Sequence, residues 1–273
     1  MSETANIDLS GDQAAGLRRL FGTRATQVVA FASGRESCGR TTLLVQTAAA
    51  LAAAGHAVVI VDENPAPSNA VAAFGLTARY DLMHAIEGER TLRQVALPAA
   101  PLVQVVPAAR AARELDPLDA GARRRLAVCL QEMQRGAAFV LIDCATRRGG
   151  HLSALAQAAR HLAVVVAAHG SAITHAYALI KHMAQERGRD GFQVVITRAR
   201  AKEEARAIFD NMKRVAREHL GVRLVFLGAS MVPVTEHLAE ALTTRLPPSV
   251  EEAETGGFVF PQPAAKLEGI MMV

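Results

Sequence analysis

The chain has 273 residues, of which 51% are apolar, with 20 Gly, 11 Pro and 3 Cys, so it can bury a large core and is neither disordered, collagenous nor a disulfide framework. Lysine stands only at Lys181, Lys202, Lys213 and Lys266, which excludes a Schiff-base lysine and the lysine of a standard phosphate-binding loop from the first 180 residues. The formal net charge of +4 comes from scattered arginines without a basic run or interleaved aromatic residues, so nucleic-acid binding is not expected.

Three parts follow one another along the chain. Residues 1–23 form a short amphipathic lead, residues 24–245 alternate strands and helices, and residues 246–273 form a tail with Pro, Gly and an acidic patch, which is expected to be flexible. No early apolar segment has a positively charged flank and a cleavage site, and no run reaches about 18 apolar residues. A cytoplasmic protein with reduced cysteines is therefore expected.

The middle part begins with a buried strand predicted at Thr26–Ser33, and a Gly-containing loop then leads into a helix over residues 41–54. His56–Asn64 is a second buried strand with an acidic end. The same pattern predicts further strands near residues 101–108, 137–145, 161–168, 191–199 and 222–229, and helices over residues 173–188 and 203–221.

Apolar strands that alternate with helices indicate a doubly wound α/β domain, with a mainly parallel sheet and helices on both faces. Ligands of such sheets lie at the carboxyl ends of the strands, which here are the loops after Ala32, Val61 and Ile142.

The first of these loops has most of the pattern of a phosphate-binding loop, G-x-x-x-x-G-K-[ST]. Gly34, Gly39 and Thr41 fit this pattern, but Arg40 stands at the lysine position. Such loops bind phosphate through backbone N–H groups and a helix N-terminus, while the hydroxyl binds Mg²⁺. Arginine keeps the positive charge of lysine but is longer, planar and fork-shaped, so it need not replace a compact ammonium group.

Several motifs resemble the MinD/ParA family of deviant phosphate-loop ATPases. They are SGRESCGRTT from Ser33, VDEN from Val61 and LIDCA from Leu141. Two further segments, Asp12–Arg18 (DQAAGLR) and Ile173–Lys181 (ITHAYALIK), are similar to the FlhG/FleN family of flagellar regulators within that group. The resemblance runs from about residue 10 to about residue 235, and it implies a regulator of flagellar number and placement with the phosphate-loop fold.

The resemblance also implies where ATP or ADP with Mg²⁺ would bind. The cofactor-binding positions of the family fall on Gly34, Arg35, Gly39, Arg40, Thr41, Thr42, Asp62 and Asp143. The Mg²⁺ positions among them are Thr41, Asp62 and Asp143.

This chain departs from the family where nucleotide chemistry would take place. Arg35 and Arg40 replace both lysines, Glu36 and Ser37 replace loop glycines, Asn64 replaces the acid that orients water, Cys144 and Arg147 replace Thr and Gly, and Thr197 replaces the Asn that reads adenine. Phosphoryl transfer depends on positioning and charge stabilisation, so these changes are expected to cost several orders of magnitude in rate. The sequence therefore predicts weak or absent ATP hydrolysis, and no catalytic residue is assigned.

The lead is expected to bind a partner. Asp12 would cap about two helical turns from Gln13 to Leu20, which are too short to be stable alone in water. The resemblance implies that this helix docks on the flagellar GTPase FlhF and stimulates GTP hydrolysis. Gln13 would then reach toward the GTPase site, Leu17 and Leu20 would anchor the helix, and Arg18 would add a charged contact. The alternative is a helix that packs on its own domain.

Other readings of the sequence stay open. The chain could be an active switch ATPase that dimerises on ATP, with Arg35 and Arg40 in place of the lysines, or a ParA-like partitioning protein bound to DNA, which the DQAAGLR lead disfavours. A flagellar transcription regulator, a switch-ring component and a second copy of the chain are further candidate partners. Peripheral association with the inner membrane or the cell pole also stays open, although the prolines and glutamates of the tail disfavour an amphipathic membrane helix.

Overall fold

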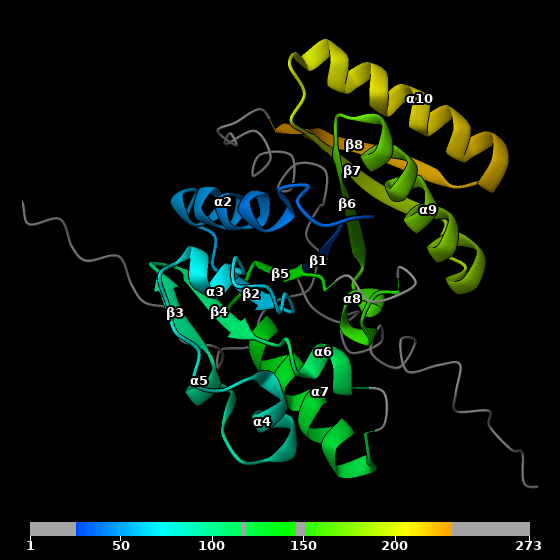
Figure 1. Ribbon diagram of the computed structural model, residues 1–273. Helices are drawn as coiled ribbons and strands as arrows, with labels where there is room; N and C mark the ends of the chain where they lie inside the picture. Colours follow the sequence, from blue (N-terminus) through cyan, green and yellow to red (C-terminus); the bar gives the residue numbers. More distant parts are fainter. Residues whose placement is uncertain (1–25, 116–117, 146–150, 231–273) are drawn as a thin grey trace, which may run out of the picture.

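The computed structural model describes residues 26–115, 118–145 and 151–230. Eight strands in these ranges form one sheet in the order β3-β4-β2-β5-β1-β6-β7-β8 (Figure 1). β3 is antiparallel to β4, and every other neighbouring pair is parallel. The strands are β1 (Gln27–Ala32), β2 (Val58–Asp62), β3 (Leu97–Ala100), β4 (Val103–Pro107), β5 (Phe139–Asp143), β6 (His161–Ala167), β7 (Gly191–Thr197) and β8 (Arg223–Ser230).

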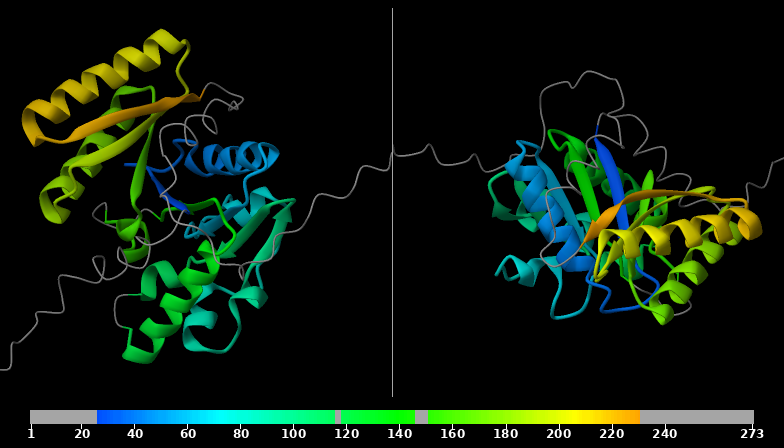
Figure 2. Two further views of the ribbon diagram at one scale, coloured as in Figure 1. Left: turned by 180° about the vertical axis from the view of Figure 1, so that it is seen from behind. Right: turned by 90° about the horizontal axis from the view of Figure 1, so that it is seen from above.

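Helices cover both faces of the sheet, as the sequence predicts, and the two further views in Figure 2 show the layers. One face carries α2 (Arg40–Ala53) and α3 (Ala70–Ala73). The other carries α4 (Leu82–Glu87), α5 (Leu92–Val95), α6 (Ala111–Glu114), α7 (Ala120–Gln134), α8 (Ala154–Ala158), α9 (Gly170–Arg187) and α10 (Lys202–Leu220). The doubly wound α/β architecture is thereby confirmed.

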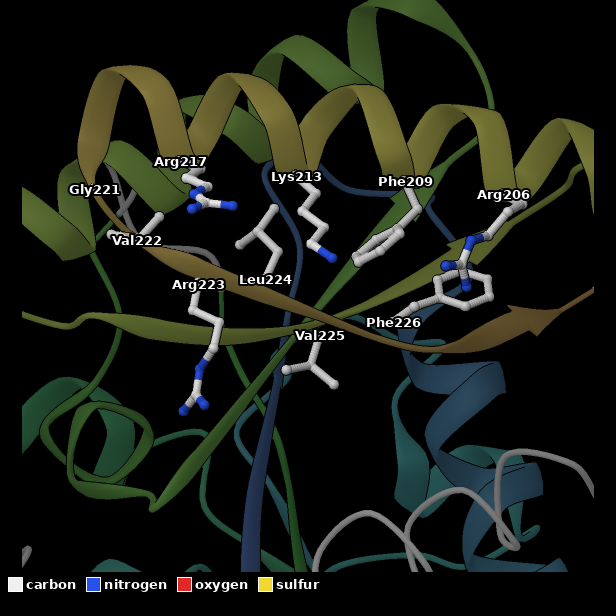
Figure 3. Close-up of a pocket in the computed structure, with 10 residues that line it drawn as sticks. All are labelled: Arg206, Phe209, Lys213, Arg217, Gly221, Val222, Arg223, Leu224, Val225 and Phe226. Atoms are coloured by element: carbon white, nitrogen blue, oxygen red, sulfur yellow. The ribbon is translucent and has the colours of Figure 1, made fainter.

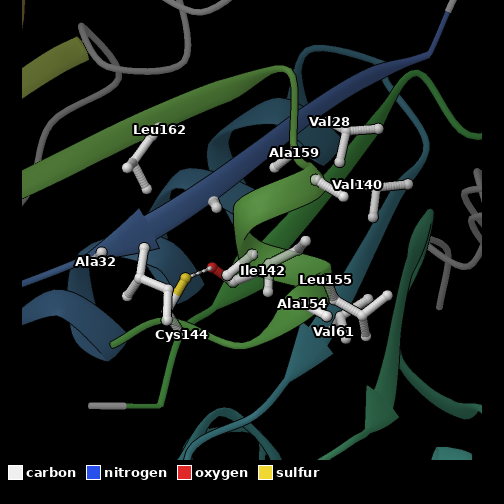
Figure 4. Packing of buried hydrophobic residues seen from close by; sticks show 14 of the residues in the cluster. Val28, Ala32, Val61, Val140, Ile142, Cys144, Ala154, Leu155, Ala159 and Leu162 are labelled. Atoms are coloured by element: carbon white, nitrogen blue, oxygen red, sulfur yellow. Dashed lines mark hydrogen bonds between the residues drawn. The ribbon is translucent and has the colours of Figure 1, made fainter. Parts of the chain in front are cut away.

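The central strands are apolar throughout because each of their faces is covered. In β1, Val28 and Ala30 belong to one buried cluster, while Val29 and Phe31 belong to the cluster on the opposite face. Figure 4 shows part of the first cluster, where Leu155 of α8 lies among side chains of the strands. A strand buried on both faces shows no alternation of polar and apolar residues, which explains the continuous runs in the sequence.

The carboxyl ends of the central strands lie together at one edge of the sheet. In the parallel register, Asp143 of β5 stands beside Phe31 of β1 on one side and beside Asp62 of β2 on the other. The loops that follow these three strands therefore leave the sheet next to one another. This arrangement brings the loop before α2 close to both acidic strand ends.

β3 is an element that the sequence patterns missed. It consists of only four residues, lies at one edge of the sheet and contains Pro98. Proline cannot donate a hydrogen bond to a ladder and so belongs at strand edges, and a short edge strand also resists pairing with other chains. A four-residue segment that contains a proline shows no strand pattern in the sequence.

The predicted lead (residues 1–23) and tail (residues 246–273) lie outside the described residues, and so do residues 231–245 of the predicted domain. Among the helices of the described ranges, none combines the length and the apolar character that crossing a membrane requires.

Candidate functional site

The loop between β1 and α2 is held in shape by its own backbone and by α9. The hydroxyl of Ser33 donates a hydrogen bond to the carbonyl oxygen of Arg35 at 2.8 Å. Ser37 and Gly39 both have a positive φ, of 62° and 79°, which turns the chain sharply into the first residue of α2. Gly34 lies so close to α9 that an added Cβ would be 2.2 Å from the backbone carbon of His175. The absence of a side chain at position 34 therefore lets the loop and α9 meet.

A cavity of about 520 Å³ opens between this loop and the loop after β2. Its lining consists of Ser33, Glu36, Ser37, Cys38, Gly39, Arg40, Thr41, Thr42, Asn64, Pro65, Ala66, Ser68 and Arg198. Four of the predicted cofactor-binding residues, Gly39 to Thr42, are in this lining. The other four, Gly34, Arg35, Asp62 and Asp143, are not, although they lie in the adjoining loops and strand ends.

Arg40 is bound to Asp143. Its Nε donates a hydrogen bond to Oδ1 of Asp143 at 2.5 Å, and the two side chains are 10% and 0% exposed. Burial opposes the charge of Arg40, but the carboxylate of Asp143 more than offsets this and raises the pKa of Arg40 above its ordinary value. The cation at the lysine position is therefore neutralised by a carboxylate of the protein itself.

The second oxygen of Asp143 is also engaged, through a chain of hydrogen bonds that crosses the site. The hydroxyl of Thr41 donates to Oδ2 of Asp143 at 2.6 Å, and Nδ2 of Asn64 donates to the Thr41 hydroxyl at 3.1 Å. Asn64 stands where the family has an acid that orients water. An amide at this position acts as a donor to Thr41, which a carboxylate could not do.

Asp62 is buried and holds the loop that follows β2. It accepts hydrogen bonds from the backbone N–H groups of Val71 at 2.9 Å and Asn64 at 3.1 Å. Burial raises its pKa to about 6, an effect that these N–H groups oppose and that the nearby carboxylate of Asp143 adds to. A Mg²⁺ ion would have to compete with protein donors at both predicted acidic ligands, Asp62 and Asp143. The described geometry therefore fits an anion at the start of α2 but does not fit Mg²⁺.

Arg35 and Thr197, two further residues that differ from the family pattern, also form hydrogen bonds in the structure. Nη1 of Arg35 donates a hydrogen bond to the hydroxyl of Ser171 at the start of α9, at 3.0 Å, and this contact is exposed. The hydroxyl of Thr197, at the predicted adenine-reading position, is buried and donates to the carbonyl oxygen of Cys38 at 2.8 Å. Thr197 thus supports the loop, and it does not line the cavity.

Sequence reasoning missed Glu63 and Arg198. Glu63 is completely buried, and its carboxylate accepts hydrogen bonds from the hydroxyl of Ser153, the N-cap of α8, and from the backbone N–H of Ala145 at 3.4 Å. It links the segments after β2 and β5. Arg198 has a φ of 59° and places an exposed cation at the cavity. In the sequence, Glu63 could have been noticed as an acidic residue between Asp62 and Asn64, and Arg198 as the residue that follows the end of a strand at Thr197.

Two curated relatives are similar to the chain along most of its length, whereas no family model matches it. The antiactivator FleN of Pseudomonas aeruginosa is 28% identical over 226 residues, which are 83% of this chain and 80% of that protein. The flagellum site-determining protein YlxH of Helicobacter pylori is 22% identical over 205 residues, which are 75% and 69% of the two chains.

Solved structures share the fold. The MinC:MinD cell division complex of Aquifex aeolicus matches with a TM-score of 0.57 at 17% identity, covering 79% of this chain and 86% of the other. MinD of Pyrococcus horikoshii complexed with Mg-ADP matches with a TM-score of 0.53 at 18% identity, covering 79% and 86%.

Proposed function

We propose that the chain is a FleN/FlhG-type member of the MinD/ParA family and that it regulates flagellar number and placement by binding partners, with weak or absent ATP hydrolysis. The names of its relatives, an antiactivator and a flagellum site-determining protein, support the flagellar role. Action in the cytoplasm, with or without peripheral contact to the inner membrane or cell pole, is part of the proposal.

The observation that carries this proposal is the pair of Arg40 and Asp143. A cation that assists phosphoryl transfer has to face the phosphates, and a carboxylate that holds Mg²⁺ has to offer free oxygens. Here the guanidinium group and both carboxylate oxygens are engaged by protein partners. Asn64, moreover, is an amide where the family orients water with an acid. This arrangement supports binding and structure over turnover.

We also propose that the chain binds nucleotide with fewer contacts than an intact phosphate-binding site would provide. The backbone N–H groups at the start of α2, the hydroxyl of Thr42 and the cation of Arg198 supply an anion site in the cavity. Thr41, Asp62 and Asp143 would hold Mg²⁺ only after giving up their present hydrogen bonds. ATP or ADP is thus proposed to bind mainly through its phosphates, with Mg²⁺ adding little.

The first prediction concerns the binding and hydrolysis of nucleotide. In calorimetric titrations, ATP and ADP are expected to bind with an affinity that hardly changes when Mg²⁺ is added, because the metal ligands are engaged. Hydrolysis of ATP is expected to stay at the level of the Thr41→Ala variant, which removes the hydroxyl that a working site needs for Mg²⁺. Hydrolysis that falls on Thr41→Ala would contradict the proposal and favour the active switch that dimerises on ATP.

The second prediction concerns the lead, which lies outside the described residues. A peptide of residues 1–23 is proposed to stimulate GTP hydrolysis by a flagellar GTPase of the FlhF type, through Asp12, Gln13, Leu17 and Arg18. The same peptide with Gln13→Ala is expected to lose most of this stimulation, because an alanine cannot reach the GTPase site with a polar group. A peptide of scrambled sequence and equal composition is the control. Equal stimulation by the Gln13→Ala peptide would contradict the assignment.

Other proposed partners are a flagellar transcription regulator, a switch-ring component and a second copy of the chain. The ParA-like alternative predicts binding to duplex DNA that weakens steeply with salt, which a filter-binding titration at two salt concentrations would detect.

A further inference from the structure

A second hollow lies far from the nucleotide loop, between α10 and the edge strand β8, with a volume of about 620 Å³. It is lined by Arg206, Phe209, Lys213, Arg217, Gly221, Val222, Arg223, Leu224, Val225 and Phe226, which are referred to below as the α10–β8 groove. Figure 3 shows Lys213, Arg217 and Phe209 projecting from α10 toward the strand. The groove belongs to none of the functions proposed above.

The groove is strongly cationic. Four of its lining residues are basic and none is acidic. Arg206 pairs with Asp210 at 3.2 Å and lies over the rings of Phe209 and Phe226, at 5.6 and 5.4 Å from their centroids. The other three cations, Lys213, Arg217 and Arg223, form no ion pair within the part of the chain that the structure describes.

The base of the groove is apolar and borders a free sheet edge. Phe209 of α10 lies 4.9 Å from Phe226 of β8, measured between ring centroids, and Leu224 lies beside them. β8 pairs with β7 on one side and with no other strand of the described ranges on its second side. A free edge offers unpaired backbone groups to an extended segment. The chemistry of the groove thus suits an extended segment that carries carboxylates and aromatic rings.

We propose that this groove binds the chain's own segment Val250–Phe260, whose sequence is VEEAETGGFVF. Its three glutamates, Glu251, Glu252 and Glu254, carry the charge opposite to that of the groove's cations. Of the three cations without an ion pair in the described residues, Lys213 and Arg217 project from α10 toward β8, whereas Arg223 projects from β8 on its other side (Figure 3). Its two phenylalanines match the apolar base. This segment lies outside the described residues.

The chain is long enough for this contact. The described part ends at Ser230, the last residue of β8, and 20 residues separate it from Glu251. At about 3.3 Å per residue these can span on the order of 60 Å, whereas returning along the eight residues of β8 needs about 25 Å. Tethering also gives the segment a high effective concentration at the groove, which a separate acidic partner would lack.

Carbodiimide cross-linking of the full chain tests the proposal, because this reagent joins a lysine amine to a carboxylate in direct contact. The expected product joins Lys213 to Glu251, Glu252 or Glu254, and its yield should fall at high salt. Lys202, at the start of the same helix, is exposed and serves as the internal control. Its link to the same glutamates is expected to be about tenfold weaker, since only Lys213 lies in the groove.

A charge exchange sharpens this test. The Lys213→Glu variant is expected to lose the link, and adding Glu252→Lys should restore a link between positions 213 and 252, with circular dichroism checking the fold of both variants. Equal linking of Lys202 and Lys213, or failure of the exchange to restore the link, would overturn the proposal. Links that form mainly between isotope-labelled and unlabelled chains would assign the groove to a second copy.

Discussion

The Asp143→Ala variant is expected to lower the free energy of unfolding by about 3 to 5 kcal/mol in the absence of any nucleotide. The substitution leaves the guanidinium group of Arg40 buried without a counter-charge, and it also takes the acceptor from the Thr41 hydroxyl. Urea unfolding followed by circular dichroism measures this loss. The size of the effect would identify the pair as part of the folded structure itself.

A double variant and an exposed pair provide the controls. Arg40→Met combined with Asp143→Leu removes both charges, so it should cost much less than the sum of the single variants, because no unpaired charge stays buried. Arg206 and Asp210 form a half-exposed pair on α10, and Asp210→Ala should cost at most about 1 kcal/mol, since solvent screens such pairs. A loss below about 1 kcal/mol for Asp143→Ala would mean that the pair is not formed in solution.

Arg40 and Asp143 can either stabilise the fold by pairing with each other or bind a ligand, but they cannot do both at once. As long as Arg40 is paired with Asp143, the cation at the lysine position is not available to phosphate, and the carboxylate of Asp143 is not available to Mg²⁺. Using Arg40 and Asp143 for phosphoryl transfer would require separating this buried pair, and leaving a buried charge without its partner costs about 3 to 5 kcal/mol. The pair therefore gives a physical reason, in addition to the altered loop residues, to expect weak hydrolysis.

The fold was predictable because the central strands are covered on both faces. Continuous apolar runs such as Val28–Ala32 leave few alternatives to a parallel sheet, and the regular spacing of helices between them implies the crossovers. β3 was not predictable in the same way, since Pro98 and a half-buried edge position carry no such signal. Sequence patterns thus identified the strands that are buried on both faces, but not the half-buried edge strand β3.

The position of the loop between β1 and α2 was predictable, but its contacts were not. The glycine spacing placed the loop correctly at the start of α2, whereas the direction of the Arg40 side chain depends on Asp143, which lies 103 residues away. Glu63 likewise finds Ser153, 90 residues further along the chain. A motif gives residue types and spacing, but the meeting of Arg40 with Asp143 depends on the register of β1 beside β5.

Replacing Gly34 by alanine is expected to destabilise the protein by about 2 to 3 kcal/mol. The new Cβ would lie 2.2 Å from the backbone carbon and 2.3 Å from the carbonyl oxygen of His175, and backbone atoms in the middle of α9 cannot move aside as a side-chain end could. The loop would have to withdraw from α9, which would also strain the contact of Arg35 with Ser171. Urea unfolding of Gly34→Ala beside the unaltered chain measures the cost.

Gly170→Ala is the matched control, because it changes the same residue type at the first position of the same helix, where an added Cβ meets no atom within 4 Å. Its stability should stay within about 1 kcal/mol of the unaltered chain, with any change toward higher stability, since alanine favours a helix more than glycine does. If Gly34→Ala behaved like this control, the loop would not lie against α9. The close contact with His175 would then not be the reason for a glycine at position 34.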